Sequence, residues 1–164
     1  MLKTLGTIAI VLFMVLPTLI LIAGQLSLLT GKRPTDIGVK NGMLKPPLEK
    51  SWNVVSSQAT QHPHTDYHVI EPLKFTGNGK VAFAKLTSIV RGMDGASVIA
   101  AQPNYLHAEF QTKLLKFVDD VEFALDESAG VIHMRSASRL GRKDFGVNRK
   151  RLETIRAHFN RQAI

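Results

Sequence analysis

The sequence contains no cysteine, and this absence removes several classes of function at once. A chain without thiols has no disulfide framework, no iron–sulfur cluster, no thiolate zinc site and no cysteine nucleophile. It also has no cysteine on which a lipid anchor could be attached. Its 164 residues leave room for one ordinary domain and a short additional segment, but not for two domains.

Motifs for nucleotide binding and for serine hydrolysis are absent as well. The segment 77–80 (GNGK) has no glycine at the distance that a phosphate-binding loop requires, and no Ser or Thr follows its lysine. No serine lies in a G-x-S-x-G turn. We therefore expect no cofactor.

One long apolar run opens the chain. No charged residue lies between Thr4 and Gly31, and Leu5–Ala23 is almost wholly apolar. As a helix with a rise of about 1.5 Å per residue, this run would extend roughly 28 Å, close to the hydrocarbon thickness of a bilayer. The rival interpretations are a cleaved signal peptide, which has a shorter apolar core, and a buried helix, which need not be apolar all round. We predict that residues 1–30 form a transmembrane anchor.

The orientation of this anchor is ambiguous in the sequence. Lys3 precedes the apolar run, whereas Lys32, Arg33 and Lys40 come after it, which leans slightly toward a cytoplasmic domain. Single N-terminal anchors that begin with a basic residue nevertheless often export the domain attached to them. We expect a single-pass protein of the cell inner membrane with a periplasmic domain, and the opposite orientation stays open.

The net charge of +8 is concentrated near the end of the chain. Basic residues crowd the stretch from Arg135 to Arg161, where Asp144 and Glu153 are the only acids. This skew favours anionic partners such as lipid headgroups or acidic polymers, although a solvated basic helix face is the simpler explanation. Nucleic acid would suit the charge but not an exported domain, so we do not expect it as a partner.

Periodicity predicts an α+β fold in the remainder of the chain. Residues 31–50 are rich in Pro and Gly and form a linker packed on the domain, which comprises residues 51–164. Alternating or short apolar segments predict strands, and i, i+3, i+4 spacing predicts helices, the first capped by Asn78. We expect strands at 52–57, 67–70, 97–101, 105–111, 117–125 and 131–140, and helices at 79–92 and 147–160. The result is a two-layer domain with an antiparallel sheet of about four strands and two helices on one face.

Several sequence blocks together resemble a known family. They are 105–110 (YLHAEF), 117–123 (FVDDVEF), 135–141 (RSASRLG) and 144–151 (DFGVNRKR), with 31–34 (GKRP) and 53–58 (NVVSSQ) upstream. This chain resembles the domain-of-unknown-function family 1499 from about Gly31 to Phe159. Many members carry a cysteine where this chain has Val54, so no role of that thiol operates here. The resemblance implies an envelope-associated domain, membrane-anchored or exported, and it supplies no catalytic residues.

Strand register predicts a polar cluster between sheet and helix. Successive strand side chains point to opposite faces, which places Asp119, Ser136 and Ser138 inward, beside Asn148 at the start of the last helix. Arg149 or Arg151 is expected to join them. A buried carboxylate must be paired or hydrogen-bonded, so the cluster either ties the helix down or forms an anion-binding site at the helix start.

The opposite face of the sheet carries further ionisable side chains. These are His107, Glu109, Asp120, Glu122, His133, Arg135 and Arg139. Cross-strand charge pairs are an ordinary way to complete a solvent-facing sheet, and the alternative is a membrane-bound hydrolase using Asp119 or Asp120 with His107 or Glu109. The spacing of His62, His64, Asp66 and His68 would suit a metal in an extended segment, but a solvated polar turn explains it better, so we predict no metal site.

These observations favour a non-enzymatic envelope protein. We expect an anchored domain that binds an anionic lipid, a polymer or a membrane-protein partner through the basic helix and the polar cluster. The candidate ligand-binding residues are Asp119, Ser136, Ser138, Asn148, Arg149 and Arg151.

Overall fold

The computed structural model describes residues 2–161 and, within the first helix, the side chains from residue 10 onward. The side chain of Lys3, which is expected to flank the anchor, therefore lies outside the described part. Residues 1 and 162–164 lie outside it entirely. The described elements are α1 (Leu2–Gln25), β1 (Val54–Ser56), the 3-10 helices η1 (Ala59–Gln61) and η2 (Asp66–His68), β2 (Leu73–Lys74), α2 (Gly79–Arg91), β3 (Ala96–Ala101), β4 (Tyr105–Gln111), β5 (Val118–Asp126), β6 (Val131–Ser138) and α3 (Val147–Arg161).

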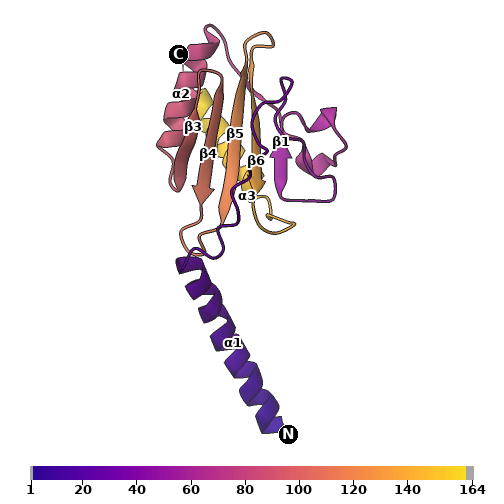
Figure 1. Cartoon of the computed structure of the whole chain (residues 1–164), viewed down its shortest axis with the longest axis vertical. Coiled ribbons are helices and arrows are strands. Elements are labelled where there is room, and N and C mark those ends of the chain that lie inside the picture. Colours follow the sequence, from indigo (N-terminus) through magenta and orange to yellow (C-terminus); the bar gives the residue numbers. More distant parts are fainter. Residues whose placement is uncertain (1, 162–164) are drawn as a thin grey trace.

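The centre of the domain is one antiparallel sheet of six strands (Figure 1). Strands β3 to β6 form a meander, each paired with its neighbour in the chain, and the turn after Asp126 joins β5 to β6. β1 and β2 both pair with the outer edge of β6, β1 along Arg135–Ala137 and β2 along Val131–Ile132. The prediction of an antiparallel α+β fold is confirmed, and the count of about four strands is too low because these two short strands share one edge.

Helices α2 and α3 lie against one face of the sheet and contact each other (Figure 1). Asn78 caps α2 as predicted, since its side-chain oxygen accepts hydrogen bonds from the backbone of Lys80 and Val81. Most of the core between the layers is apolar, and it comes from the inward positions of the strands and the inner stripes of the helices. It includes Phe83, Leu86, Val90, Leu106, Val121, Phe123, Met134, Leu152 and Ile155.

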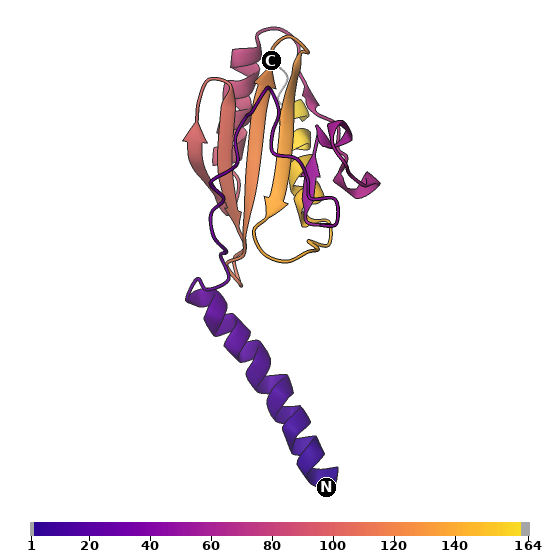
Figure 2. The ribbon, with the colours of Figure 1, turned by 45° about the vertical axis from the view of Figure 1, so that its right-hand side comes forward.

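The other face of the sheet is covered by the segment 31–47, which runs across the strands without regular structure (Figure 2). The backbone N–H of Gly38 donates to the Glu122 carboxylate at 2.8 Å, and Leu44 is 1% exposed. Because this segment packs there, His107 and Asp120 are buried rather than solvent-facing. The expectation of an exposed charged face is therefore wrong.

Residues 67–70 do not form the strand that their sequence predicts. Asp66–His68 is a 3-10 turn, and only Val69 makes an isolated bridge, to Ser56. The turn is held by the buried His68 ring, which accepts from the backbone of Thr65 and lies 2.6 Å from the carbonyl oxygen of Ser51. The side-chain contacts of His68 thus outweigh the strand propensity of its neighbours.

Helix α1 projects away from one end of the domain (Figures 1 and 2). Its last turn touches the β4–β5 loop, where the Gln25 side chain donates to the carbonyl oxygen of Leu114 at 2.8 Å. Apolar side chains from Ile10 to Ile22 are exposed along it. Within the residues that the structure describes, no helix has the length and hydropathy needed to cross a membrane, so the anchor predicted for residues 1–30 is not supported there.

Candidate functional site

Five of the six predicted site residues do converge between the sheet and α3. The Ser136 hydroxyl donates to Asn148 Oδ1 at 2.5 Å, and the Asn148 amide donates to Ser138 Oγ at 2.9 Å. The Arg151 guanidinium donates to Asn148 Oδ1 at 2.8 Å and forms an ion pair with Asp119 at 2.5 Å. The strand register and the start of α3 thus place these groups as the alternation predicted.

Their hydrogen bonds are made almost entirely with one another and with nearby backbone. Asn148 is fully buried, and its amide also donates to the carbonyl oxygen of Asn53 beside β1. Asp144 caps α3 by accepting from the backbone of Gly146 and Asn148. A ligand here would have to replace bonds that already join β1, β6 and α3. These contacts favour a structural role, in which the cluster holds α3 to the sheet, over an anion-binding role. A ligand-binding role of this cluster stays a prediction.

Arg149 does not join the cluster. Its guanidinium donates to the backbone carbonyl oxygens of Tyr67 and Val69, at 2.8 and 2.7 Å. Arg156 similarly donates to the carbonyl oxygens of Glu71 and Pro72. Since these arginines hold the 66–72 segment to α3, the last helix offers fewer free cations than its sequence suggests. An anion site on the basic helix face is therefore less favoured than the sequence indicated.

A buried ion pair lies on the opposite face of the sheet, under the 31–47 segment. Glu122 is fully buried on β5 and pairs with Arg135 on β6 at 2.8 Å. Its other oxygen accepts from the Tyr105 hydroxyl at 2.9 Å and from the backbone of Gly38. Burial, together with the adjacent Glu122 charge, raises the pKa of Tyr105 above its usual value, so the phenol stays a donor.

A second charged group surrounds Arg139, just after β6. Arg139 donates to both Asp120 oxygens at 2.8 Å and also to Glu109, while His107 lies 2.8 Å from Asp120. Burial pushes the pKa of Asp120 upward, but the hydrogen bonds from Arg139 and His107 outweigh it, and the pKa lies below its usual value. Burial also pushes the pKa of Glu109 upward, and the hydrogen bonds from Arg33 and Arg139 outweigh it and lower this pKa. Both carboxylates are therefore held in the charged form.

This arrangement bears on the metal and hydrolase alternatives. Among the described residues, one group of three potential ligand atoms lies within 4.8 Å, that of His107, Glu109 and Asp120. Arg139 already bonds both of these carboxylates, so a cation there would face a guanidinium. Asp119 pairs with α3 on the other face of the sheet. The two aspartates named for a hydrolase therefore do not share a site.

The histidine-rich segment 62–68 also fails to gather its side chains into a metal site among the described residues. His68 is committed to Thr65 and Ser51, as described above. The His64 ring bonds the carbonyl oxygen of His62 at 2.7 Å, and His62 Nε2 is buried without a hydrogen-bond partner. The turn geometry separates groups that an extended strand would have aligned.

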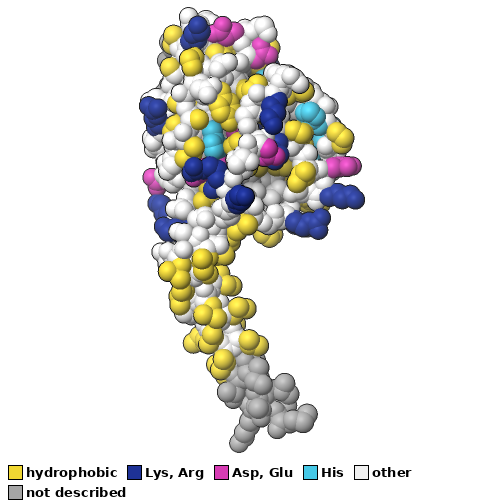
Figure 3. Space-filling view, in the orientation of Figure 1, with side chains coloured by type: hydrophobic (Ala, Val, Ile, Leu, Met, Phe, Trp, Pro, Cys, Tyr) yellow, Lys and Arg dark blue, Asp and Glu magenta, His cyan; other side chains and the backbone are white. Residues whose placement is uncertain are grey.

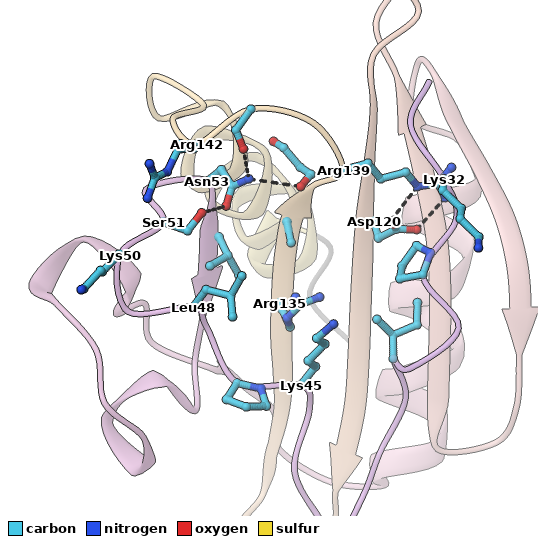
Figure 4. Close-up of a pocket in the computed structure, with 17 residues that line it drawn as sticks. Lys32, Lys45, Leu48, Lys50, Ser51, Asn53, Asp120, Arg135, Arg139 and Arg142 are labelled. Carbon is cyan, nitrogen blue, oxygen red and sulfur yellow. Dashed lines mark hydrogen bonds and ion pairs between the residues drawn. The ribbon is translucent and has the colours of Figure 1, made fainter. Parts of the chain in front are cut away.

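The strongest candidate site is a pocket of about 430 Å³ between the segments 32–53 and the end of β6. We call it the basic pocket (Figure 4). Its volume lies in the range of small-molecule sites, which is roughly 300–1,000 Å³. Apolar walls come from Pro34, Ile37, Pro46, Leu48, Val54 and Ala137, and the charged lining residues are Lys32, Lys45, Lys50, Asp120, Arg135, Arg139 and Arg142.

The cations of the basic pocket are only partly neutralised within the protein. Lys45 pairs with Asp36, and the two buried arginines pair with the acids described above. The exposed side chains of Lys32, Lys50 and Arg142 have no acidic partner among the described residues. Figure 4 shows Lys32 on one side of the pocket and Lys50 with Arg142 on the other. The pocket therefore carries an excess of positive charge.

Arg135 adds an unsatisfied group to this pocket. The residue is 6% exposed, and its Nε is buried without a hydrogen-bond partner. Most buried polar atoms in proteins are hydrogen-bonded, so this N–H donor, in a residue that lines the pocket, is an exception. An anionic or acceptor oxygen would complete it.

Sequence reasoning missed this pocket because its two halves are distant in the chain. The available signal was the pair of short basic stretches at 32–33 and 139–143. Only the packing of residues 31–53 on β6 brings them together. The sequence prediction instead placed the basic surface on α3.

Comparison with known proteins supports a family but no activity. No curated protein and no solved structure matches the chain significantly. A family model described as "Protein of unknown function (DUF1499)" matches residues 44–159, which include β1 to β6 and most of α3. The resemblance drawn from the sequence blocks is confirmed: the chain belongs to the DUF1499 family of proteins of unknown function.

Proposed function

We propose that this protein is a non-enzymatic binding domain that works at a membrane and takes an anionic ligand in the basic pocket. The ligand class is a phosphate-like or carboxylate group joined to an apolar body, such as an anionic lipid. The observation that carries the proposal is the excess of cations around a pocket that Arg135 helps to line, with the Nε of this arginine buried and without a hydrogen-bond partner.

The chemistry of the lining supports this ligand class. Lys32, Lys50 and Arg142 at the edges supply long-range attraction, which a charged ligand experiences before contact. Arg135 supplies a directed donor, and guanidinium groups suit phosphate and carboxylate oxygens. Pro46 and the exposed Leu48 offer apolar contact beside the charges. A ligand with both a charged and an apolar part would use the whole pocket.

Membrane attachment is the second part of the proposal. The apolar side chains of α1 are exposed and lie away from the domain, so lipid is the environment that suits them (Figure 3). We propose that α1 holds the domain at the inner membrane with the domain on the periplasmic side. Alkaline carbonate extraction should leave the full-length chain with the membranes, and recovery in the supernatant would overturn attachment. A topology reporter after Ile164 tests the side.

The binding test uses the full chain in neutral detergent micelles. A short-chain phosphatidylglycerol, the matching phosphatidylcholine and inorganic phosphate are titrated separately, and the Nε–H resonance of Arg135 is followed by NMR. We expect a salt-sensitive shift with phosphatidylglycerol and none with phosphatidylcholine. An equal response to inorganic phosphate at the same concentration would assign the site to a free anion, which contradicts the lipid form of the proposal.

A matched pair of variants separates pocket binding from general charge. Lys50→Glu with Arg142→Glu should weaken the phosphatidylglycerol response at least about tenfold, since both unpaired cations become repulsive. Lys74→Glu makes the same kind of change on β2, at an exposed position outside the pocket, and should leave the response intact. Equal losses from both changes, or no shift of Arg135 with any anion, would refute the pocket.

A further inference from the structure

Phe145, in the loop between β6 and α3, is the most exposed large apolar side chain among the described residues. Its exposed fraction is 95%, and its φ is 54°, in the left-handed region that favours glycine. A non-glycine residue in this region is strained, and a β-carbon makes it so. Neither the exposure nor the strain contributes to the stability of the fold. Strain of this kind concentrates at functional positions.

The loop holds Phe145 in a fixed place instead of letting it move. Trp52 pairs with the loop on both sides: its N–H donates to the carbonyl oxygen of Arg142 at 2.8 Å, and its carbonyl oxygen accepts from the N–H of Asp144 at 3.1 Å. The Asp144 side chain is buried and accepts from Gly146, Asn148 and the Tyr67 hydroxyl. The exposed ring is thus attached to a turn that these backbone and side-chain hydrogen bonds hold in place.

The surroundings of Phe145 combine cations with further apolar groups. Arg142, Lys143 and Lys150 are exposed near it in the chain, and Lys143 also lies over the Trp52 ring at 4.9 Å. Leu140, at the start of the same loop, is 42% exposed. An aromatic residue flanked by Lys and Arg is the composition of protein surfaces that enter the interface of a membrane.

The loop lies at the end of the domain from which α1 departs. In both ribbon views the loop lies at the same end of the domain as the junction with α1 (Figures 1 and 2). A β-carbon placed on Gly31, just after α1, would lie 2.7 Å from Cβ of Arg139. Lys and Arg side chains gather on this half of the domain, above the apolar surface of α1 (Figure 3).

We infer that residues 140–145 are a lipid-insertion loop that docks this end of the domain on an anionic bilayer. Phe145 enters the interfacial region with Leu140 beside it, while Arg142, Lys143 and Lys150 contact headgroups. The inference rests on the membrane part of the proposed function and deepens it. Arg142 also lines the basic pocket, so docking brings headgroups to the mouth of that pocket.

The test places a spin label in the loop of the full chain. Because the sequence has no cysteine, Phe145→Cys carries the only thiol and can be labelled selectively. Ala129→Cys, in the exposed β5–β6 turn, is the matched control at another exposed site. Each labelled protein is reconstituted into vesicles of phosphatidylcholine alone or mixed with phosphatidylglycerol. Accessibility to oxygen and to a nickel chelate then gives the depth of each label.

We expect the label at 145 to lie about 5–10 Å below the headgroups of anionic vesicles, and less deeply in neutral ones. The label at 129 should stay in water in both. A label at 145 that is as water-accessible as the label at 129 would overturn the inference. Dipolar broadening between labels at 145 without lipid would show a second copy covering the loop, which also overturns it.

A second variant separates insertion from folding. With the label moved to Leu140→Cys, the change Phe145→Gly should raise water accessibility at 140 severalfold while relieving the backbone strain. Unfolding by urea should therefore need at least as much denaturant as in the parent. No change in accessibility at 140 would refute a role of Phe145. If docking fails but the Arg135 Nε–H still shifts with phosphatidylglycerol in micelles, the pocket stands and the insertion loop does not.

Discussion

Replacing Glu122 with glutamine should be among the most damaging single changes in this domain. The carboxylate is fully buried and accepts three hydrogen bonds, from Arg135, Tyr105 and the backbone of Gly38. Glutamine preserves the shape and one acceptor oxygen, but it turns an N–H donor toward the Arg135 guanidinium or toward the other donors. The variant therefore keeps the volume of the core and loses the charge that compensates Arg135.

The expected loss is set by the buried cation that remains. Removing one partner of a buried ion pair costs about 3–5 kcal/mol, because the other charge stays desolvated without compensation. Small domains have unfolding free energies of about 5–15 kcal/mol, so Glu122→Gln would remove a large part of the stability. Glu122→Gln combined with Arg135→Met should lose less than the sum of the single changes, since the double variant leaves no uncompensated charge.

Urea unfolding of the full chain in neutral micelles measures both effects. Trp52, the single tryptophan, reports the packing of the segment before β1 against the 139–146 loop, and far-UV circular dichroism reports the sheet. Glu49→Gln is the matched control, because it removes the same charge from an exposed side chain. A loss below about 1 kcal/mol for Glu122→Gln would refute the assigned burial, as would additive losses in the double variant.

Three further predictions test other contacts. Burial and the adjacent Asp144 carboxylate raise the pKa of Tyr67 from 10.0 to about 12. The contribution of this phenol to stability is therefore complete below about pH 10 and lost as the pH rises through about 12. The tyrosinate absorbance at about pH 10.5 should stay low until the chain is unfolded. Since the pKa of Asp120 is lowered in the folded chain, its carboxylate contributes to the free energy of unfolding above about pH 4, and this contribution is lost as the pH falls further. Asp120→Asn should therefore be less stable than the parent at about pH 7 but lose less urea resistance between about pH 5 and pH 3. Gly95 and Gly77 share φ +76°, but a β-carbon at Gly95 would lie 2.6 Å from the carbonyl oxygen of Gln111, whereas Gly77 has open space. Gly95→Ala should therefore cost about 1–3 kcal/mol more than Gly77→Ala in urea unfolding, and equal costs would contradict the close approach.

Local patterns were sufficient to predict most of the strands of the antiparallel sheet and the polar cluster. Alternation located β4 at its observed bounds and placed Ser136 and Ser138 on the inward face of β6, because side-chain direction has a period of two in a strand. Helix geometry also distinguishes Arg149 from Arg151 as the partner of Asn148. Residues three apart share a helix face, so Arg151 lies beside Asn148 while Arg149 points away.

The covered face of the sheet could not be predicted in the same way. The segment 31–47 has no period, and its fixed position depends on single contacts such as Gly38 with Glu122 and Leu44 with Gln58. These contacts join residues far apart in the chain, and no local spacing encodes them. The basic pocket depends on the same packing, which is why its lysines and arginines were visible in the sequence while the pocket was not.

The junction between α1 and the domain has a mechanical consequence. Gln25 is hydrogen-bonded to the β4–β5 loop, and Gly31 lies close to Arg139. Gly38 is hydrogen-bonded to Glu122 in the sheet, so the segment between the helix and the sheet is attached to the domain along its length. We therefore expect a tilt of α1 to turn the domain with it. The opening of the basic pocket should then keep a fixed orientation relative to the axis of α1.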